Sequence, residues 1–156
     1  LISKKDFSSG TNKANINVEG IGNILPLICY EILFSDDVRS RVSKNTKLII
    51  NITNDAWFGN TAGPYQHLAL TKIRAVELGL PLARVANTGI SILISPYGEE
   101  IIKIPLNKEG VKTTKLMSRL DETIYKKFGD YIFIISILFI LFINGFIRLK
   151  NNFNRI

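Results

Sequence analysis

The sequence predicts an α/β layered domain followed by one transmembrane helix. Short apolar runs alternate with helix-like segments through residues 21–130, and the 17 residues of 131–147 contain no charge. The composition agrees, because 46% of the 156 residues are apolar, far more than a disordered chain carries. We therefore divide the chain into a polar loop or linker (1–20), the layered domain (21–130), a transmembrane helix (131–147) and a basic tail (148–156).

The first half of the domain is predicted to run strand, helix, strand. The apolar run 24–29 follows a Gly-Asn pair and is typical of a buried strand. Ser35 can cap a helix whose first turn holds two aspartates, which suit the positive end of the helix dipole. We expect this helix to end near residue 43. The apolar run 47–53 predicts a second buried strand.

The second half is predicted to be one helix and then several strands. After a loop over 59–64, Pro64 fits the first position of a helix that extends to residue 78. Gly79 and then Pro81 end that helix. Three further strands are expected over 82–86, 90–95 and 99–104, with the turn Pro96-Tyr97-Gly98 between the last two.

The run 131–147 is apolar on every face and is followed by basic residues, which is typical of a membrane span. No acidic residue follows Asp130, whereas Arg148, Lys150 and Arg155 do follow, so the positive-inside rule predicts a cytoplasmic C-terminus and a periplasmic domain. The first twenty residues contain no apolar signal-peptide core. We therefore expect the chain to be a fragment of a longer membrane protein.

Several classes of protein are disfavoured by composition. A single Cys excludes an internal disulfide framework and a Cys-cluster metal site, and a single His makes a His-rich metal site equally improbable. Of the net charge of +7, the basic tail carries +3, and the other +4 is spread thinly over residues 1–130, without a basic stripe carrying interleaved aromatics. We expect neither a bound metal nor a nucleic-acid partner.

Cys29 is the first candidate for chemistry. It closes the first predicted strand, where a nucleophile would be rigidly held and the next backbone N–H could face a developing oxyanion. The alternative is that this lone cysteine is a small buried hydrophobic residue.

A second group of candidates follows the second predicted strand. Asn54, Asp55 and Trp57 fall where α/β folds collect binding groups. The alternative is that Asn54 and Asp55 make a turn while Trp57 and Phe58 cover the core.

Five segments carry a family resemblance. They are Ile28-Cys29-Tyr30-Glu31, Asn51-Ile-Thr-Asn-Asp-Ala-Trp-Phe-Gly59, Gly63-Pro-Tyr-Gln-His67, Arg74-Ala-Val-Glu-Leu-Gly79 and Arg84-Val-Ala-Asn-Thr-Gly89. Together they resemble apolipoprotein N-acyltransferase, a bacterial inner-membrane family of the nitrilase, or carbon-nitrogen hydrolase, superfamily. The resemblance extends over about residues 10–147. It implies a partial nitrilase-like α-β-β-α domain followed by the transmembrane helix.

The resemblance also implies a reaction. Family members move an acyl chain from a phospholipid to a cysteine thioester, and then to the N-terminal amine of a diacylglyceryl-cysteine lipoprotein. Cys29 matches the nucleophile, and Tyr30 and Glu31 match positions that support it. We expect Asn54, Asp55, Trp57 and Phe58 to bind substrate or support their loop. No cofactor is expected, and the partners are the phospholipid donor, the lipoprotein acceptor and the membrane.

The chain departs from the family pattern upstream of Cys29. Nitrilase-type sites use a Glu base and a Lys, both tens of residues before the cysteine, whereas only 28 residues precede Cys29. Lys4, Lys5, Lys13, Asp6 and Glu19 lack the expected strand context, so none is assigned. We expect the chain to be inactive alone, unless a separate chain supplies the N-terminal part. A membrane-tethered nitrilase or amidase-type C–N hydrolase, or an inactive remnant of a split gene, remain alternatives.

The remaining polar candidates are expected to be structural. His67 lies near the start of the helix 64–78, where the dipole would favour a neutral ring, and we favour a hydrogen-bonding role over catalysis. Arg74 and Glu77 are spaced to form an ion pair on one helix face. Arg84, with the segment 87–89, is expected to hold the nucleophile loop.

Overall fold

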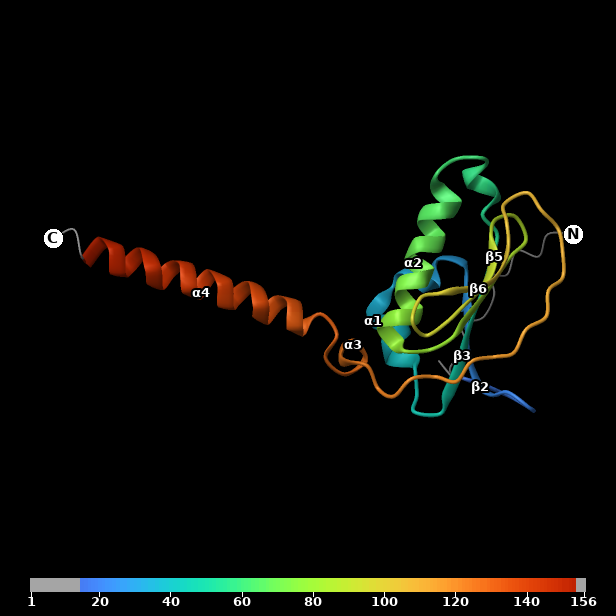
Figure 1. Ribbon diagram of the computed structural model, residues 1–156, viewed down its shortest axis with the longest axis horizontal. Coiled ribbons are helices and arrows are strands. Elements are labelled where there is room, and N and C mark those ends of the chain that lie inside the picture. Colours follow the sequence, from blue (N-terminus) through green and yellow to red (C-terminus); the bar gives the residue numbers. More distant parts are fainter. Residues whose placement is uncertain (1–14, 154–156) are drawn as a thin grey trace, which may run out of the picture.

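The computed structural model describes residues 15–153, which form one mixed sheet with helices against it and a long helix at the C-terminal end (Figure 1). The strand order is β1-β2-β3-β4-β5-β6. The strands are β1 (Ile16–Val18), β2 (Gly22–Ile28), β3 (Thr46–Thr53), β4 (Leu82–Ala86), β5 (Ser91–Ile94) and β6 (Glu100–Ile104). The pairs β2–β3 and β3–β4 are parallel, and the other neighbouring pairs are antiparallel.

The helical elements occupy the connections between strands and the C-terminal region. They are the 3-10 turns η1 (Cys29–Leu33) and η2 (Ala56–Phe58) and the helices α1 (Ser35–Arg41), α2 (Gly63–Leu78), α3 (Ile124–Phe128) and α4 (Tyr131–Phe153). Parallel strands need such crossover connections, because a tight turn cannot join them.

The hydrophobic core lies between the sheet and the helices α1 and α2. Alternate residues of β2, β3 and β4 point toward these helices, as the two-residue period of a strand requires. The buried side chains of this core include Leu25, Leu27, Ile49 and Leu82 from the sheet, Val38 from α1, and Leu68, Ala75 and Leu78 from α2. This core fixes the positions of β2 and β3, at whose ends the candidate site begins.

The opposite face of the sheet exposes apolar side chains. Ile28 pairs with Ile52, which pairs with Val85, so the three lie side by side across the parallel strands. Their exposed fractions are 69%, 56% and 55%. Parallel strands are normally covered on both faces. The described residues therefore form one sheet and one helix layer, as expected for part of an α-β-β-α domain.

Helix α2 follows its local signals closely. Pro64 lies in its first turn, where the missing N–H leaves no hydrogen bond unmade. Gly79 ends it with a left-handed φ of 62°, and its N–H is directed to the carbonyls of Ala75 and Val76. The predicted turn at residues 96–98 also forms, with the Gly98 N–H donating to the Ser95 carbonyl.

Three local predictions were wrong. The strand β1 lies within the segment 1–20 that we predicted as loop; the structure describes this segment only from residue 15. Its three residues give no periodic signal, and they form a strand because Ile16 and its neighbours pair with β2. Ser35 does not cap α1: Phe34 holds the N-cap position without a side-chain bond, because α1 continues directly from η1. The helix ends at Arg41, short of the expected residue 43.

Helix α4 is the one helix within residues 15–153 that is long and apolar enough to cross a membrane. Its segment Tyr131–Arg148 has a mean hydropathy of 2.2, and none of it is buried. Figure 1 shows α4 extending away from the sheet and its covering helices. Length and composition alone support a membrane role for it.

The segment before α4 is tied to the sheet and its covering helices by three side chains, Arg119, Thr123 and Lys126, which we call the α3 clamp. The Arg119 guanidinium donates to the carbonyls of three residues around the start of β3, at 3.2, 2.8 and 3.0 Å. The Lys126 ammonium donates to the carbonyls of Arg39 and Val42 at 2.6 and 2.8 Å, at the end of α1. Thr123 donates to the Glu77 carbonyl of α2. The clamp thus anchors the chain just before α4.

Candidate active site

Cys29 lies at a sharp turn where β2 ends and η1 begins. Its φ is 50°, in the left-handed region that residues other than glycine rarely adopt. The turn is held on both sides of the thiol. The Glu31 carboxylate accepts from the Ile28 N–H at 2.6 Å, and the Asn51 amide donates to the Cys29 carbonyl at 3.1 Å. The backbone that presents the thiol is therefore fixed by side chains.

The Cys29 sulfur accepts a hydrogen bond from Thr53. The hydroxyl of Thr53 lies 3.3 Å from Cys29 Sγ, and the threonine side chain is buried. The two residues meet because Ile28 and Ile52 pair in the parallel sheet, so the residues that follow them share its carboxyl edge. A hydroxyl donor at this position suits a sulfur that carries negative charge.

A buried polar group, which we call the Asp55 cluster, lies beside the thiol. Its members are Asn51, Asp55, His67, Thr71 and Arg84. The Arg84 guanidinium donates to the Asp55 carboxylate at 2.6 Å, to the Asn51 amide oxygen at 2.9 Å and to the Thr71 hydroxyl at 3.0 Å. Asp55 and Arg84 are each 1% exposed. A buried ion pair of this kind requires such additional hydrogen bonds to offset the loss of water.

His67 belongs to this cluster through its Nδ1 atom, which lies 2.9 Å from Asp55 Oδ1 and 3.1 Å from the Arg84 guanidinium. Burial lowers the pKa of His67, and the Arg84 charge lowers it further. The hydrogen bond and charge of Asp55 and a backbone interaction with Cys29 oppose this shift. Burial is thus the main cause of the lowered pKa of His67, whereas we had expected the helix dipole to act.

No hydrogen bond within residues 15–153 joins the His67 ring to the Cys29 sulfur. His67 Nε2 is buried without a hydrogen bond of ordinary geometry in this part of the chain. The described contacts fit the hydrogen-bonding role that we favoured over catalysis.

Three rings form an aromatic wall next to the cluster. Tyr30 stacks on His67 with centroids 5.1 Å apart and planes inclined by 23°. Phe58 forms T-shaped contacts with Tyr30 and His67, with ring centroids 6.3 and 6.4 Å apart. A Cβ at Gly63 would lie 2.4 Å from the Phe58 ring, so glycine is required there for α2 to pass.

The predicted loop residues separate into different environments. Asn54 makes a turn, because its side-chain oxygen accepts from the Ala56 N–H at 3.1 Å. Trp57 is 84% exposed and does not cover the core, contrary to our alternative interpretation. Phe58 is half-buried within the aromatic wall. Asp55 is the buried member and joins the loop to β4 through Arg84.

Arg84 supports Cys29, although by a different route from the one we expected. It contacts Asn51, whose amide group donates to the Cys29 carbonyl. The segment 87–89 instead holds the Asp55 loop. The Thr88 carbonyl accepts from the Asp55 N–H at 2.6 Å, and a Cβ at Gly89 would lie 2.7 Å from the Asp55 carboxylate.

Glu31 and the Arg74–Glu77 pair form ion pairs that support the fold. The Glu31 carboxylate also pairs with Arg41 at 3.3 Å, and Arg41 donates to the Pro26 carbonyl at 3.2 Å. Glu31 thus connects the turn at Cys29 with α1. Arg74 and Glu77 form the expected ion pair on α2. Burial raises the pKa of Glu77, while Arg74 acts in the opposite direction.

Our sequence reasoning missed Asn51 and Thr53. Both face the buried side of β3, alternating with Ile50 and Ile52. Polar residues at successive inward positions of an otherwise apolar strand were the available signal, because buried polar groups need partners.

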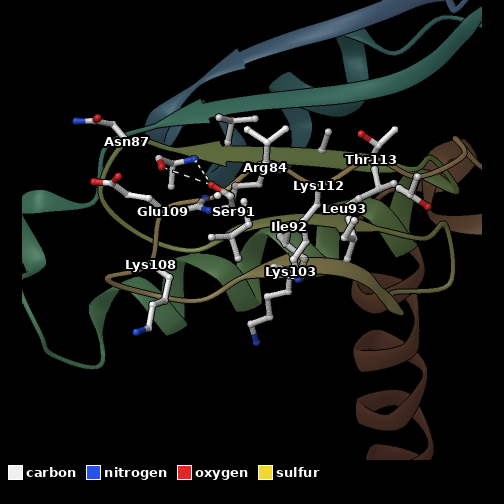
Figure 2. Close-up of a pocket in the computed structure, with 18 residues that line it drawn as sticks. Arg84, Asn87, Ser91, Ile92, Leu93, Lys103, Lys108, Glu109, Lys112 and Thr113 are labelled. Atoms are coloured by element: carbon white, nitrogen blue, oxygen red, sulfur yellow. Dashed lines mark hydrogen bonds between the residues drawn. The ribbon is translucent and has the colours of Figure 1, made fainter.

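A pocket lies on the other face of the sheet. Figure 2 shows it between the strands β4–β6 and the segment 108–114, with Lys108, Glu109 and Lys112 at its border. Cys29, Thr53 and Asp55 are not among its lining residues. Arg84 of the Asp55 cluster does line it, so the pocket adjoins this cluster but does not contain the thiol.

Comparison with known sequences identifies related proteins. The family model of carbon-nitrogen hydrolases matches residues 3–125. An apolipoprotein N-acyltransferase of Bradyrhizobium diazoefficiens is 44% identical over 124 residues, covering 80% of this chain and 23% of that protein. One of Rickettsia bellii is 46% identical over 122 residues, covering 78% of this chain and 24% of that protein. The chain thus spans about a quarter of the length of these curated relatives.

Solved structures share the fold at low sequence identity. A nitrilase-superfamily protein of Saccharomyces cerevisiae matches with a TM-score of 0.55 at 20% identity, over 65% of this chain and 40% of that one. A carbon-nitrogen hydrolase of Helicobacter pylori matches with a TM-score of 0.55 at 15% identity, over 66% of this chain and 43% of that one. These matches confirm the predicted nitrilase-like fold.

Proposed function

The chain belongs to the carbon-nitrogen hydrolase family, and on this premise we propose that it is the cysteine-bearing part of a membrane N-acyltransferase. The acyl donor is a phospholipid, and the acceptor is the N-terminal amine of a diacylglyceryl-cysteine lipoprotein. The names of its relatives support this choice over an amide hydrolase.

The observation that carries the proposal is the setting of Cys29. The chain's single thiol lies at a left-handed turn on the carboxyl edge of the parallel strands, with a hydroxyl donor 3.3 Å from its sulfur. A nucleophile at such a turn projects from the sheet edge, and the backbone N–H groups that follow can face an oxyanion.

Two steps account for the transfer. A general base takes the proton of the Cys29 thiol, and the thiolate attacks the acyl carbonyl carbon. A C–S bond forms, the ester C–O bond breaks, and the base gives its proton to the departing lysophospholipid alkoxide. The lipoprotein amine then attacks the thioester, so that a C–N bond forms and the C–S bond breaks. The amine proton passes to a general base. A thioester suits this reaction because it remains reactive toward an amine.

The resemblance assigns that base to a glutamate upstream of the cysteine and adds a lysine beside it. We propose that a separate chain, or a longer form of this one, carries both groups. The 156 residues alone should then give no N-acylation, because catalytic groups that act together lose most of their effect when one is absent.

Other residues take supporting roles in this proposal. Tyr30 and Glu31 hold the turn, through the aromatic wall and through the bond to the Ile28 N–H. Asp55 anchors the loop after β3. The highly exposed Trp57, with Phe58 beside it, is a contact for the acyl chain or the lipoprotein. Asn54 shapes their loop.

We propose that α4 crosses the bacterial inner membrane with the sheet on the periplasmic side. The apolar segment Tyr131–Arg148 supports the span, and the basic residues after it support a cytoplasmic C-terminus. In this topology the layered domain predicted over 21–130 is periplasmic, the segment 131–147 spans the membrane, and the basic tail 148–156 is cytoplasmic. In the chain completed with upstream membrane helices, a reporter fused after Ile156 should behave as cytoplasmic and one inserted at 105–110 as periplasmic. The reverse pattern would contradict the orientation.

The test of function uses the chain co-expressed with the upstream part of the Rickettsia bellii relative. N-acylation of a diacylated lipopeptide should be lost in Cys29→Ser, because a serine hydroxyl is hardly ionised at neutral pH. Tyr30→Phe should reduce turnover less, since the backbone N–H of that position is retained.

The outcome also separates the alternatives. Release of free fatty acid or hydrolysis of small amides without transfer would favour a tethered C–N hydrolase. A completed enzyme that forms no product at all would favour an inactive remnant.

A further inference from the structure

The Thr53 hydroxyl lies between two acceptors. Its oxygen is 3.3 Å from Cys29 Sγ and 3.3 Å from Asp55 Oδ1. A hydroxyl has one proton, so it can donate to only one of these atoms at a time. The side chain is 5% exposed, and water therefore does not compete freely for this proton.

The two acceptors depend on Thr53 to different degrees. Asp55 already receives the Arg84 guanidinium at 2.6 Å and contacts His67 Nδ1 at 2.9 Å. Within residues 15–153, Thr53 is the one side chain that donates a hydrogen bond to the Cys29 sulfur. Loss of the Thr53 hydroxyl would therefore remove the side-chain donor to the sulfur, whereas the Asp55 carboxylate would keep its contacts with Arg84 and His67.

The direction of the hydroxyl is fixed by its place in the sheet. Thr53 is the last residue of β3, and its carbonyl accepts from the Asn87 N–H at 3.0 Å. A β-branched side chain has restricted χ1 freedom in a strand. The hydroxyl can rotate its proton between the two acceptors without moving its oxygen.

We infer that Thr53 is a positioning residue that donates its hydroxyl proton to the Cys29 thiolate and turns to Asp55 when the sulfur is protonated or acylated. The inference rests on the proposed function in one respect, that Cys29 is the nucleophile. When the amine displaces the thioester, the C–S bond breaks and the sulfur takes the electron pair. Thr53 then stabilises the departing thiolate, without transferring its proton.

The test measures the rate of alkylation of Cys29 by iodoacetamide as a function of pH, on the 156-residue chain in detergent. Cys29 is the single thiol, so the signal has one source. In Thr53→Val the midpoint of the profile should rise by about one pH unit, with about tenfold slower alkylation below the midpoint. Thr53→Ser should keep the wild-type profile, because it keeps the donor.

Thr71→Val is the matched control. Thr71 is a buried threonine of the Asp55 cluster whose hydroxyl contacts Arg84 and the His67 carbonyl and makes no hydrogen bond to the sulfur. Its profile should match the wild type. The charged and titratable groups around the thiol, which are Asp55, His67, Arg84, Glu31 and Tyr30, are the same in all these variants.

The inference fails if the Thr53→Val profile superimposes on the wild type, or if Thr71→Val shifts the midpoint equally. Thermal unfolding checks that each variant is folded. Should the valine variant not fold, Thr53→Ala against Thr53→Ser makes the same comparison. Because alkylation needs no acyl donor, this result is independent of whether acyl transfer itself occurs.

Discussion

Cations hold both ends of β3, but the buried Arg84 at one end and the partly buried cations at the other bind different kinds of partner. At the carboxyl end, Arg84 binds side chains: the Asp55 carboxylate, the Asn51 amide and the Thr71 hydroxyl. At the amino end, the cations of the α3 clamp bind backbone carbonyls, with Arg119 on three around the start of β3 and Lys126 on two at the end of α1.

This difference separates a place where chemistry can occur from a place where the chain is anchored. Carbonyl partners are present whatever the sequence, and they carry no charge that could change with pH. Side-chain partners exist only where particular residues meet, and they leave a buried charge unpaired when one is removed. The Asp55 cluster should therefore be more sensitive to substitution than the α3 clamp.

Removal of the carboxylate should have the largest effect. Asp55→Asn leaves the Arg84 guanidinium buried without its counter-charge, and we expect the free energy of unfolding to fall by about 3–5 kcal/mol. Urea titration of the wild type and of Asp55→Asn would measure this loss. The double variant Asp55→Asn/Arg84→Met should recover part of this loss, and strict additivity of the two single effects would show that the pair is not coupled.

Removal of a clamp cation should cost less. Arg119→Met breaks three bonds to carbonyls that can in part be hydrated, and we expect a loss of about 1–2 kcal/mol. The same urea titration measures this loss. An effect as large as that of Asp55→Asn would contradict the distinction between the two ends of β3.

The pH dependence of stability should also distinguish the two ends of β3, although this effect is smaller. The pKa of His67 is lowered in the folded state, so the unfolded chain binds more protons just below the ordinary histidine value of 6.5. The contribution of His67 to the free energy of unfolding should therefore be fully present above about pH 6.5. It should decline as the pH falls below this value, by at most about 1.4 kcal/mol per pH unit.

His67→Gln should flatten this part of the profile, whereas Arg119→Met should leave its shape unchanged. Melting temperatures between about pH 5 and pH 7.5 would measure both. A decline of equal slope in His67→Gln would mean that another group titrates.

Sequence reasoning succeeded where the signal is local. Pro64 and Gly79 defined α2, and the apolar runs located the central strands. It failed at β1 and did not predict α3. The strand β1 is only three residues long and forms by pairing with β2, and the helix α3 is only five residues long and follows the Thr123 cap. Neither element buries enough surface of its own to leave a periodic pattern.

The site was only partly predictable for the same reason. Cys29 and Asp55 are at strand ends and within segments that resemble the family. The bond between Thr53 and the sulfur depends on the register of β2 against β3, and Asp55 meets Arg84 across 29 positions of sequence. No local pattern encodes such distances, because the intervening chain must fold first.

Intact mass spectrometry tests the role of Cys29 most directly. The chain completed with the upstream part of a relative is incubated with phospholipid alone, without any amine acceptor. The account predicts that the wild type gains the mass of one acyl chain, that hydroxylamine removes it, and that Cys29→Ser gains none. A hydroxylamine-sensitive adduct of equal amount on the Cys29→Ser variant would contradict the account, because the nucleophile would then lie elsewhere.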